Sequence, residues 1–292
     1  MSRRALWVLA ACALFAAPVS AQMQSDLLDV FTVQVKPEKA AQFETLAKKI
    51  VAANRQSNGT NWLAAATVYG PGQTIRFIST RPNFAAIEKD NEVFMAAMNK
   101  TYGQAVAEQI FREADSCMES SLSEIRRRRW DLSSNPPADS AALSKLIGES
   151  RWVQTIMVRV RPGHALHFEE QIRTIKAAQE KAATKVTSLV SQAVAGQTGT
   201  VYYISTLRKS LSELDGATPL PQLLGEEAYE KFLKAVSESV LNSETTINRF
   251  APELSNPAEE IVAAAPDFWR PKPVVARKGA KKQTAKAATK KQ

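Results

Sequence analysis

The sequence contains one short pattern twice. Val33-Gln34-Val35-Lys36-Pro37 is followed six residues later by Phe43-Glu44, and Val158-Arg159-Val160-Arg161-Pro162 is followed six residues later by Phe168-Glu169. The offset is 125 residues at every matched position. A constant offset over such a pattern predicts two copies of one structural unit, and a chain of this kind must fold as a pair of similar halves.

Each unit is predicted to run βαββαβ. In the first, residues 28–35 alternate as a strand that places Phe31, Val33 and Val35 on one face and Val30, Thr32 and Gln34 on the other. A helix opens at Pro37, and a second helical region breaks at Gly103. Further strands are expected at 62–69, 75–80 and 119–128. The second unit repeats these elements, with Tyr203-Ile204-Ser205-Thr206 matched to Phe77-Ile78-Ser79-Thr80.

The N-terminus has the features of a secretory signal. Arg3 and Arg4 precede an apolar run from Ala5 to Pro18, which small residues follow. We expect cleavage between Ala21 and Gln22, and a mature protein that is exported, periplasmic or secreted. The alternative is a lipoprotein anchored at Cys12. No other segment is apolar and long enough to span a membrane.

The basic character lies at the end of the chain. Of the formal net charge of +9, two charges belong to Arg3 and Arg4 and eight to the stretch from Lys272 to Lys291, which leaves the remainder at −1. This stretch cannot bury enough apolar surface to fold, so a disordered tail is predicted. Export makes an anionic envelope surface the expected partner, and nucleic acid is not expected. A merely solubilising tail is the alternative.

The predicted organisation follows from these boundaries. Cleavage would leave Cys117 as the only cysteine, so a packed core rather than disulfides must hold the fold. The predicted segments are a signal (1–21), a first unit (22–135), a linker (136–150), a second unit (151–257), a C-terminal extension (258–271) and a basic tail (272–292).

A βαββαβ order gives an antiparallel sheet with both helices on one face. The opposite strand face, with Thr32 and Gln34, is too mixed for a dry core and too apolar for open water. This pattern, with the closing run 243–255, resembles the dimeric α/β-barrel superfamily, which includes antibiotic-biosynthesis-type monooxygenases, haem-degrading enzymes and stress-responsive barrel proteins. The resemblance implies an α+β fold of two ferredoxin-like repeats whose sheets pack face to face as an intramolecular barrel, either a monomeric pseudo-dimer or a homodimer.

A ligand, on this interpretation, lies between the two sheets. It would be small and apolar or acidic. The candidate pocket residues are Thr32, Gln34, Trp62, Arg76, Met157, Arg159 and Tyr202. Haem-degrading members imply an Asn, a Trp and a His in one pocket; Asn61 and Trp62 are present, but the first unit has no histidine, which disfavours haem degradation.

Arg126-Arg127-Arg128-Arg129 is the most conspicuous charged run. On a strand, alternation places two guanidinium groups on each face, and arginine binds carboxylates and phosphates in a bidentate manner. These four residues are candidates for anion binding. The alternative is a solvated edge strand whose charges prevent aggregation.

No metal site or cofactor is predicted. His164 and His167 share a helix face but lack a third ligand, so they are weak metal candidates. The Gly-x-Ser-x-Gly, His-Glu-x-x-His, Walker and Gly-x-Gly-x-x-Gly motifs are absent. The sequence therefore predicts an exported small-ligand-binding or interaction module, held to an anionic surface by its tail. The first alternative is a cofactor-independent monooxygenase-like enzyme, and a further one is a haem- or metal-handling protein.

Overall fold

Within residues 27–271, the part of the chain that this computed structural model describes, the strands close on themselves as one antiparallel barrel. The strand order is β1-β3-β2-β8-β5-β7-β6-β4. The first unit contributes β1 (Leu27–Val35), β2 (Leu63–Tyr69), β3 (Thr74–Arg81) and β4 (Met118–Arg128). The second contributes β5 (Trp152–Val160), β6 (Ser188–Ala195), β7 (Thr200–Arg208) and β8 (Val240–Phe250).

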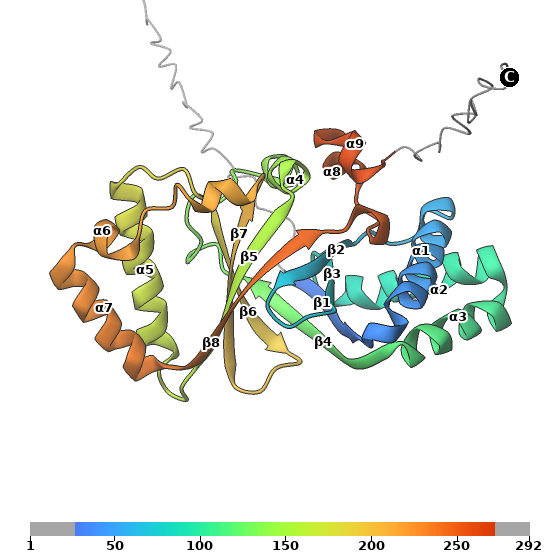
Figure 1. The fold of residues 1–292 in the computed structure, drawn as a ribbon, viewed down its shortest axis with the longest axis horizontal. Coiled ribbons are helices and arrows are strands. Elements are labelled where there is room, and N and C mark those ends of the chain that lie inside the picture. The colour runs from blue at the N-terminus through green and yellow to red at the C-terminus, as the bar shows by residue number, and fades with distance from the viewer. Residues whose placement is uncertain (1–26, 272–292) are drawn as a thin grey trace, which may run out of the picture.

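The helices form a layer on either side of the barrel (Figure 1). The first-unit layer holds η1 (Pro37–Lys39), α1 (Ala40–Gln56), α2 (Phe84–Tyr102) and α3 (Gln104–Ser116). The second-unit layer holds α5 (Ala165–Lys181), η2 (Leu211–Leu214), α6 (Leu220–Leu224) and α7 (Glu226–Ser239). The expected fold class, two ferredoxin-like repeats forming an intramolecular α/β barrel, is confirmed.

The two faces of β1 border different parts of the interior, as the alternation of its residues predicts. Val33 and Val35 are buried in the core beneath the first-unit helices. Val30 is fully buried too, but it lies on the opposite face, which lines the inside of the barrel. The predicted break at Gly103 is also present: this residue has a φ of +77° between α2 and α3, and Gly225 has a φ of +81° before α7.

The end of each unit packs on the other unit. Ser133, which follows β4, accepts a hydrogen bond at Oγ from the backbone N–H of Val190 in β6 at 2.9 Å. Ser255, which follows β8, accepts the corresponding bond from Ala64 in β2 at 2.8 Å. The two units therefore exchange their closing segments, and neither completes its own layer.

One part of the repeat alignment is wrong. Val33 pairs with Ile75, and its counterpart Val158 pairs with Tyr202, so β7 is displaced by 127 positions from β3. The sequence match between Phe77 and Tyr203 implies an offset that is smaller by one residue. A shift of one residue turns every side chain to the other face of a strand. Tyr202 therefore packs against the helices, and Tyr203 points into the barrel.

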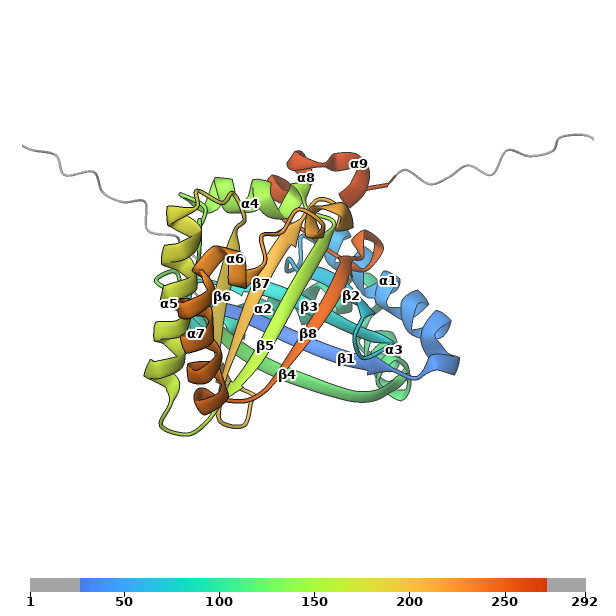
Figure 2. The same cartoon turned by 60° about the vertical axis from the view of Figure 1, so that its left-hand side comes forward.

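A cap covers one end of the barrel (Figures 1 and 2). It consists of α4 (Ser140–Glu149), which lies in the predicted linker, with α8 (Glu259–Ala264) and α9 (Pro266–Trp269), which follow η3 (Pro252–Leu254). Trp269 is fully buried and donates from Nε1 to the carbonyl of Gly148 at 2.9 Å. The segment after Pro257, the predicted C-terminal extension, thus packs back on the barrel.

The predicted signal, the alternative lipid anchor Cys12 and the basic tail Lys272–Lys291 lie outside the described residues. Cys117 is a buried free thiol. Among residues 27–271, no helix is both long enough and apolar enough to cross a bilayer.

Candidate functional site

A cavity of about 340 Å³ lies in the first unit, between its sheet and its helices. Six aromatic side chains wall it: Phe31, Phe43, Trp62, Phe77, Phe94 and Phe111. They form two groups, since Phe77 contacts Phe31 and Phe43, and Phe94 contacts Trp62 and Phe111, with ring centroids 5.9 to 6.5 Å apart. The indole N–H of Trp62 donates to the carbonyl of Leu254 at 2.8 Å, so the second unit's closing segment fixes this ring.

Polar groups gather at one side of this cavity. Asp29 of β1 and Arg81 of β3 line it together with Asp90 of α2. Arg81 is buried and pairs through Nε with Asp90 at 2.9 Å. Burial raises the pKa of Asp29, a shift that Arg81 opposes and Asp90 reinforces. Asp29 forms no ion pair within residues 27–271, and its carboxyl group lines an aromatic-walled cavity, which is an arrangement suited to accepting a ligand's hydrogen bond or proton.

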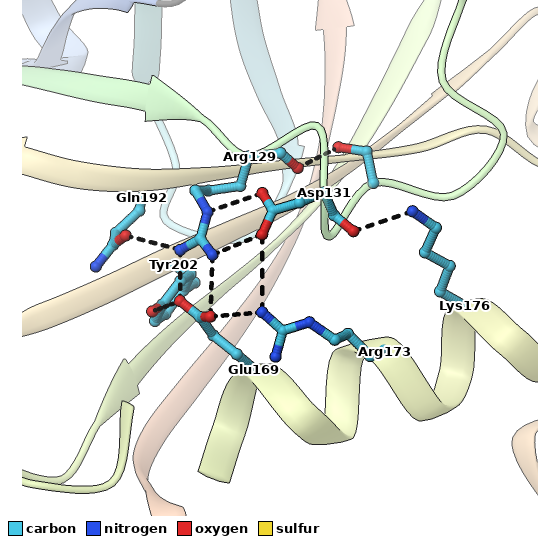
Figure 3. A network of polar contacts seen from close by, with 8 residues as sticks. Arg129, Asp131, Glu169, Arg173, Lys176, Gln192 and Tyr202 are labelled. Atoms are coloured by element: carbon cyan, nitrogen blue, oxygen red, sulfur yellow. Dashed lines mark hydrogen bonds and ion pairs between the residues drawn. The ribbon is translucent and has the colours of Figure 1, made fainter. Parts of the chain in front are cut away.

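The corresponding region of the second unit has a different lining. Ile172 of α5 stands where the first unit has Ala47, and it packs with Phe168 and Tyr202 in a buried cluster. Beside this cluster, Glu169 is held by a polar network that Figure 3 shows. At this helix position the second unit therefore carries a larger buried side chain than the first.

Glu169 is the centre of this network. It accepts hydrogen bonds from Arg129 Nη2 at 2.9 Å, Arg173 at 3.0 Å and the Tyr202 hydroxyl at 2.7 Å (Figure 3). Arg129 also pairs with Asp131 at 2.8 Å. The hydrogen bond from Arg129 is the main cause that lowers the pKa of Glu169 and also that of Asp131, while burial raises the pKa of Tyr202. Every strong donor here has a partner, so the network is structural.

A second cavity of about 280 Å³ lies inside the barrel, where the sequence predicted a ligand. Of the predicted pocket residues, Trp62, Arg76 and Met157 line it, and Trp62 borders both cavities. Thr32 and Gln34 lie on the inward face of β1 but do not border the cavity. Arg159 is bound to Gln197 and to the carbonyl of Thr198.

Tyr202 was predicted in this pocket and is not there. The register of β7 places it on the helix side, and Tyr203 takes the interior position. One of two neighbours on a strand must face inward, and only the pairing of β7 with β5 decides that it is Tyr203.

The arginine run divides as alternation predicts, but β4 is not an edge strand. It pairs with β1 and β6, so the edge explanation is wrong. Arg126 and Arg128 line the barrel cavity, Arg127 is exposed, and Arg129 belongs to the network around Glu169.

The histidines stand apart from both cavities. Ring centroids of His164 and His167 are 6.4 Å apart, at the start of α5. Within residues 27–271 no group of three or more His, Cys, Asp or Glu residues is placed to hold a metal ion.

Sequence reasoning missed the polar group of the first cavity. Asp29, Arg81 and Asp90 are far apart in the chain and belong to no motif. A usable signal was the difference in side-chain volume at equivalent core positions, because Ala47 occupies less space in the first unit than Ile172 does in the second.

No protein family and no curated protein matches the sequence. Solved structures with a similar arrangement do exist. An anthrone oxidase-like protein is 12% identical with a TM-score of 0.49, covering 80% of this chain and 94% of its own. The chlorite dismutase of Candidatus Nitrospira defluvii is 9% identical with a TM-score of 0.44, covering 83% and 96%. A haem-binding protein of Thermus thermophilus is 8% identical with a TM-score of 0.42, covering 78% and 92%. At such identities a shared fold does not carry a shared reaction.

Proposed function

We propose that this protein binds a small, largely apolar molecule in the aromatic cavity of its first unit. One observation supports this most: the first unit holds a cavity walled by six aromatic rings, and where it has the small Ala47 at that cavity the second unit has Ile172 in a buried cluster. Packing alone would favour filling such a space, because voids destabilise a core. An open, aromatic-walled chamber with a few convergent polar groups is typical of a ligand site.

The chemistry of the cavity limits the ligand. Its volume of about 340 Å³ equals that of roughly eleven water molecules at ~30 Å³ each, so the ligand is a small molecule. The six rings favour a planar, apolar body. Asp29 and Asp90 outnumber Arg81 at the polar side, so the ligand's polar end is a hydrogen-bond donor such as a phenol or an amine.

Titration with 2-naphthol tests this proposal, with naphthalene as the probe that lacks the hydroxyl group. Ala47→Ile places the second unit's residue in the first, so it should fill the cavity, preserve the fold and weaken 2-naphthol binding at least about tenfold. Ala41→Ile, on an exposed position of the same helix, is the matched control. Equal binding by wild-type protein and Ala47→Ile would contradict the assignment of the site.

Asp29→Asn tests the polar half. A carboxylate accepts a phenol's hydrogen bond more strongly than an amide oxygen does, so the variant should lose affinity for 2-naphthol and keep it for naphthalene. Because burial raises the pKa of Asp29, wild-type affinity for 2-naphthol should also fall as the pH is lowered through that pKa. An unchanged preference for the phenol in Asp29→Asn would remove Asp29 from the site.

The second candidate function is a cofactor-independent oxidation, which the position of Asp29 favours. A carboxylate with a raised pKa inside an apolar cavity can remove a proton from an activated C–H group. The carbanion then reduces O₂: an activated CH₂ becomes a carbonyl, one oxygen atom entering the product and the other leaving as water. Oxygen uptake with 2-tetralone, lost in Asp29→Asn, would support it. If 2-tetralone binds without any uptake of oxygen, the oxidation is contradicted and the binding function alone stands.

The proposal also includes export and attachment to an anionic surface. Export is proposed because of the composition of residues 1–21, and attachment because of the basic composition of Lys272–Lys291. The mature protein should bind vesicles containing anionic lipid, salt should release it, and truncation after Arg270 should abolish binding. Equal binding by the truncated protein contradicts a role for the tail.

A further inference from the structure

The cavity inside the barrel is separate from the aromatic cavity and has a different character. Arginines line its walls: Arg76 from β3, and Arg126 and Arg128 from β4. Glu244 of β8 is the acidic residue among the residues that border it in the described part of the chain. Its surroundings therefore carry an excess of positive charge.

Arg126 is held by the protein itself. It is buried, it donates from Nε to Glu124 at 2.6 Å, and its guanidinium group stacks on the Tyr203 ring at 3.4 Å from the centroid. Glu124 also accepts from the Tyr203 hydroxyl at 2.7 Å and from Gln197 at 2.8 Å. Glu124 is thereby committed to Arg126 and to neutral donors, and it does not pair with Arg76.

Arg76 has no counter-ion of its own. Its Nη1 donates to Thr67 Oγ1 at 2.8 Å and to Asn248 Oδ1 at 2.9 Å, both neutral acceptors. Among residues 27–271 it forms no ion pair, and its Nε–Nη2 edge makes no hydrogen bond. That edge has the fork geometry that binds a carboxylate through two parallel hydrogen bonds. Burial and the nearby Arg126 lower the pKa of Arg76, a shift that Glu244 and Glu124 oppose from nearby without forming an ion pair with it among residues 27–271.

The end of the cavity beneath the cap is apolar. Leu143 and Ile147 of α4 and Ile261 of α8 border it, facing Leu189 and Leu207 at the strand ends. A ligand in this space would therefore have a charged end among the arginines and a hydrocarbon end under the cap.

We propose that the barrel interior binds a small amphipathic carboxylate, with its carboxylate on the free edge of Arg76 and its hydrocarbon chain beneath α4 and α8. The volume of about 280 Å³ equals that of roughly nine water molecules at ~30 Å³ each, so only a small ligand fits. Short-chain fatty acids and simple aromatic acids are of this size. The site does not depend on the function proposed for the aromatic cavity.

Isothermal titration of the mature protein with hexanoate tests the proposal. Hexanoate should bind at a single site and raise the melting temperature, whereas 1-hexanol, which lacks the charge, and acetate, which lacks the chain, should each bind at least about tenfold more weakly. No binding of hexanoate at millimolar concentration overturns the proposal. So does an equal affinity for acetate, because the apolar end would then contribute nothing.

Substitutions locate the site. Arg76→Gln should lower hexanoate affinity at least about tenfold, while Arg127→Gln, on β4 but exposed, should leave it unchanged. Because Arg76 has no ion pair to lose, Arg76→Gln should fold; Arg76→Lys, which keeps the charge but not the fork, gives a second measurement with an intermediate affinity. Wild-type affinity in both Arg76 variants overturns the proposal.

The two cavities are distinguished in the same assay. Ala47→Ile should bind hexanoate as the wild-type protein does, and 2-naphthol should not compete with it. Competition between the two ligands would mean that hexanoate occupies the aromatic cavity, which would also overturn the assignment to the barrel.

Discussion

At the scale of single residues, the same residue type at equivalent positions of the two units can have very different surroundings. Glu169 and Glu44 occupy the same place in the repeat, yet Glu169 is buried in the network of Figure 3 and Glu44 is half-exposed beside Lys48. Both have the same local surroundings in the sequence, Phe-Glu on a helix. What separates them is Arg129, which reaches Glu169 from the end of β4, whereas Ala251 stands at the equivalent position after β8.

Glu169→Gln should lower the free energy of unfolding by about 2 kcal/mol at pH 7, because it removes a charged acceptor that three donors share. The pKa of Glu169 is lowered in the folded state, chiefly by Arg129. The carboxylate therefore contributes its full stabilisation above the unfolded-state pKa of ~4.3, and this is lost as the pH falls through the lower folded-state pKa. Urea unfolding at several pH values should show the difference between variant and wild type shrinking in acid.

The matched control is Glu44→Gln, which should change the unfolding free energy by less than about 0.5 kcal/mol because its ion pair is exposed. Comparable losses in both variants, or a Glu169→Gln loss that persists in acid, would mean that the network does not stabilise the fold through its charge.

Single residues of the site were predictable only where strand alternation fixes them. Arg76 and Met157 point inward because they occupy alternate positions on well-defined strands. Asp29, Arg81 and Asp90 were not predictable, since only the packing of α2 against the sheet brings Asp90 to Arg81.

At the scale of elements, a change of offset within the repeat limits what the pattern can predict. β1 and β5 align with an offset of 125, but the offset between β3 and β7 is 127, although the turns that precede these two strands, 70–73 and 196–199, are equal in length. Sequence similarity within the strands indicates an offset that is smaller by one residue. That offset places Tyr202 inside the barrel and Tyr203 against the helices, which is the reverse of what the structure shows. Identical residues on a strand do not fix its register; pairing with the neighbouring strand does.

The cap depends on a close approach of two helices at Gly148. A Cβ atom at this position would lie 2.5 Å from the carbonyl oxygen of Ile261 and 2.6 Å from the Cβ of Ala264. Replacing glycine by alanine in a helix normally stabilises it by about 0.5–1 kcal/mol. Here the contact with backbone reverses the sign, and Gly148→Ala should destabilise the protein by about 1–3 kcal/mol.

Thermal unfolding of Gly148→Ala measures this effect, with Lys145→Ala, an exposed position on the same helix, as the control that should be nearly neutral. A stabilised Gly148→Ala protein would show that α4 and α8 are not held together as tightly as this contact requires.

At the scale of the whole molecule, the fold was predictable because the duplicated pattern constrains both halves at once. Two βαββαβ units need partners for their inward faces, and placing both in one chain supplies them. Two features were not contained in the pattern. The edges of the two sheets are hydrogen-bonded, β2 to β8 and β4 to β6, and the closing segments cross to the opposite unit. Both depend on contacts between residues of different units, or on segments beyond the strands that alternation does not describe.

This exchange makes the two units one folding entity. A fragment of residues 22–137 would expose the edges of β2 and β4, and it would lack Leu254 and Ser255, which complete its core and hydrogen-bond β2. A fragment of residues 138–271 would expose β6 and β8 and lack Ser133. Neither fragment alone should be a stably folded monomer. Mixed in equal amounts, they should form a one-to-one complex with the circular dichroism spectrum of the intact chain. Sedimentation and denaturant unfolding of each fragment measure this directly, and a fragment that unfolds cooperatively as a monomer would contradict the interdependence of the two halves.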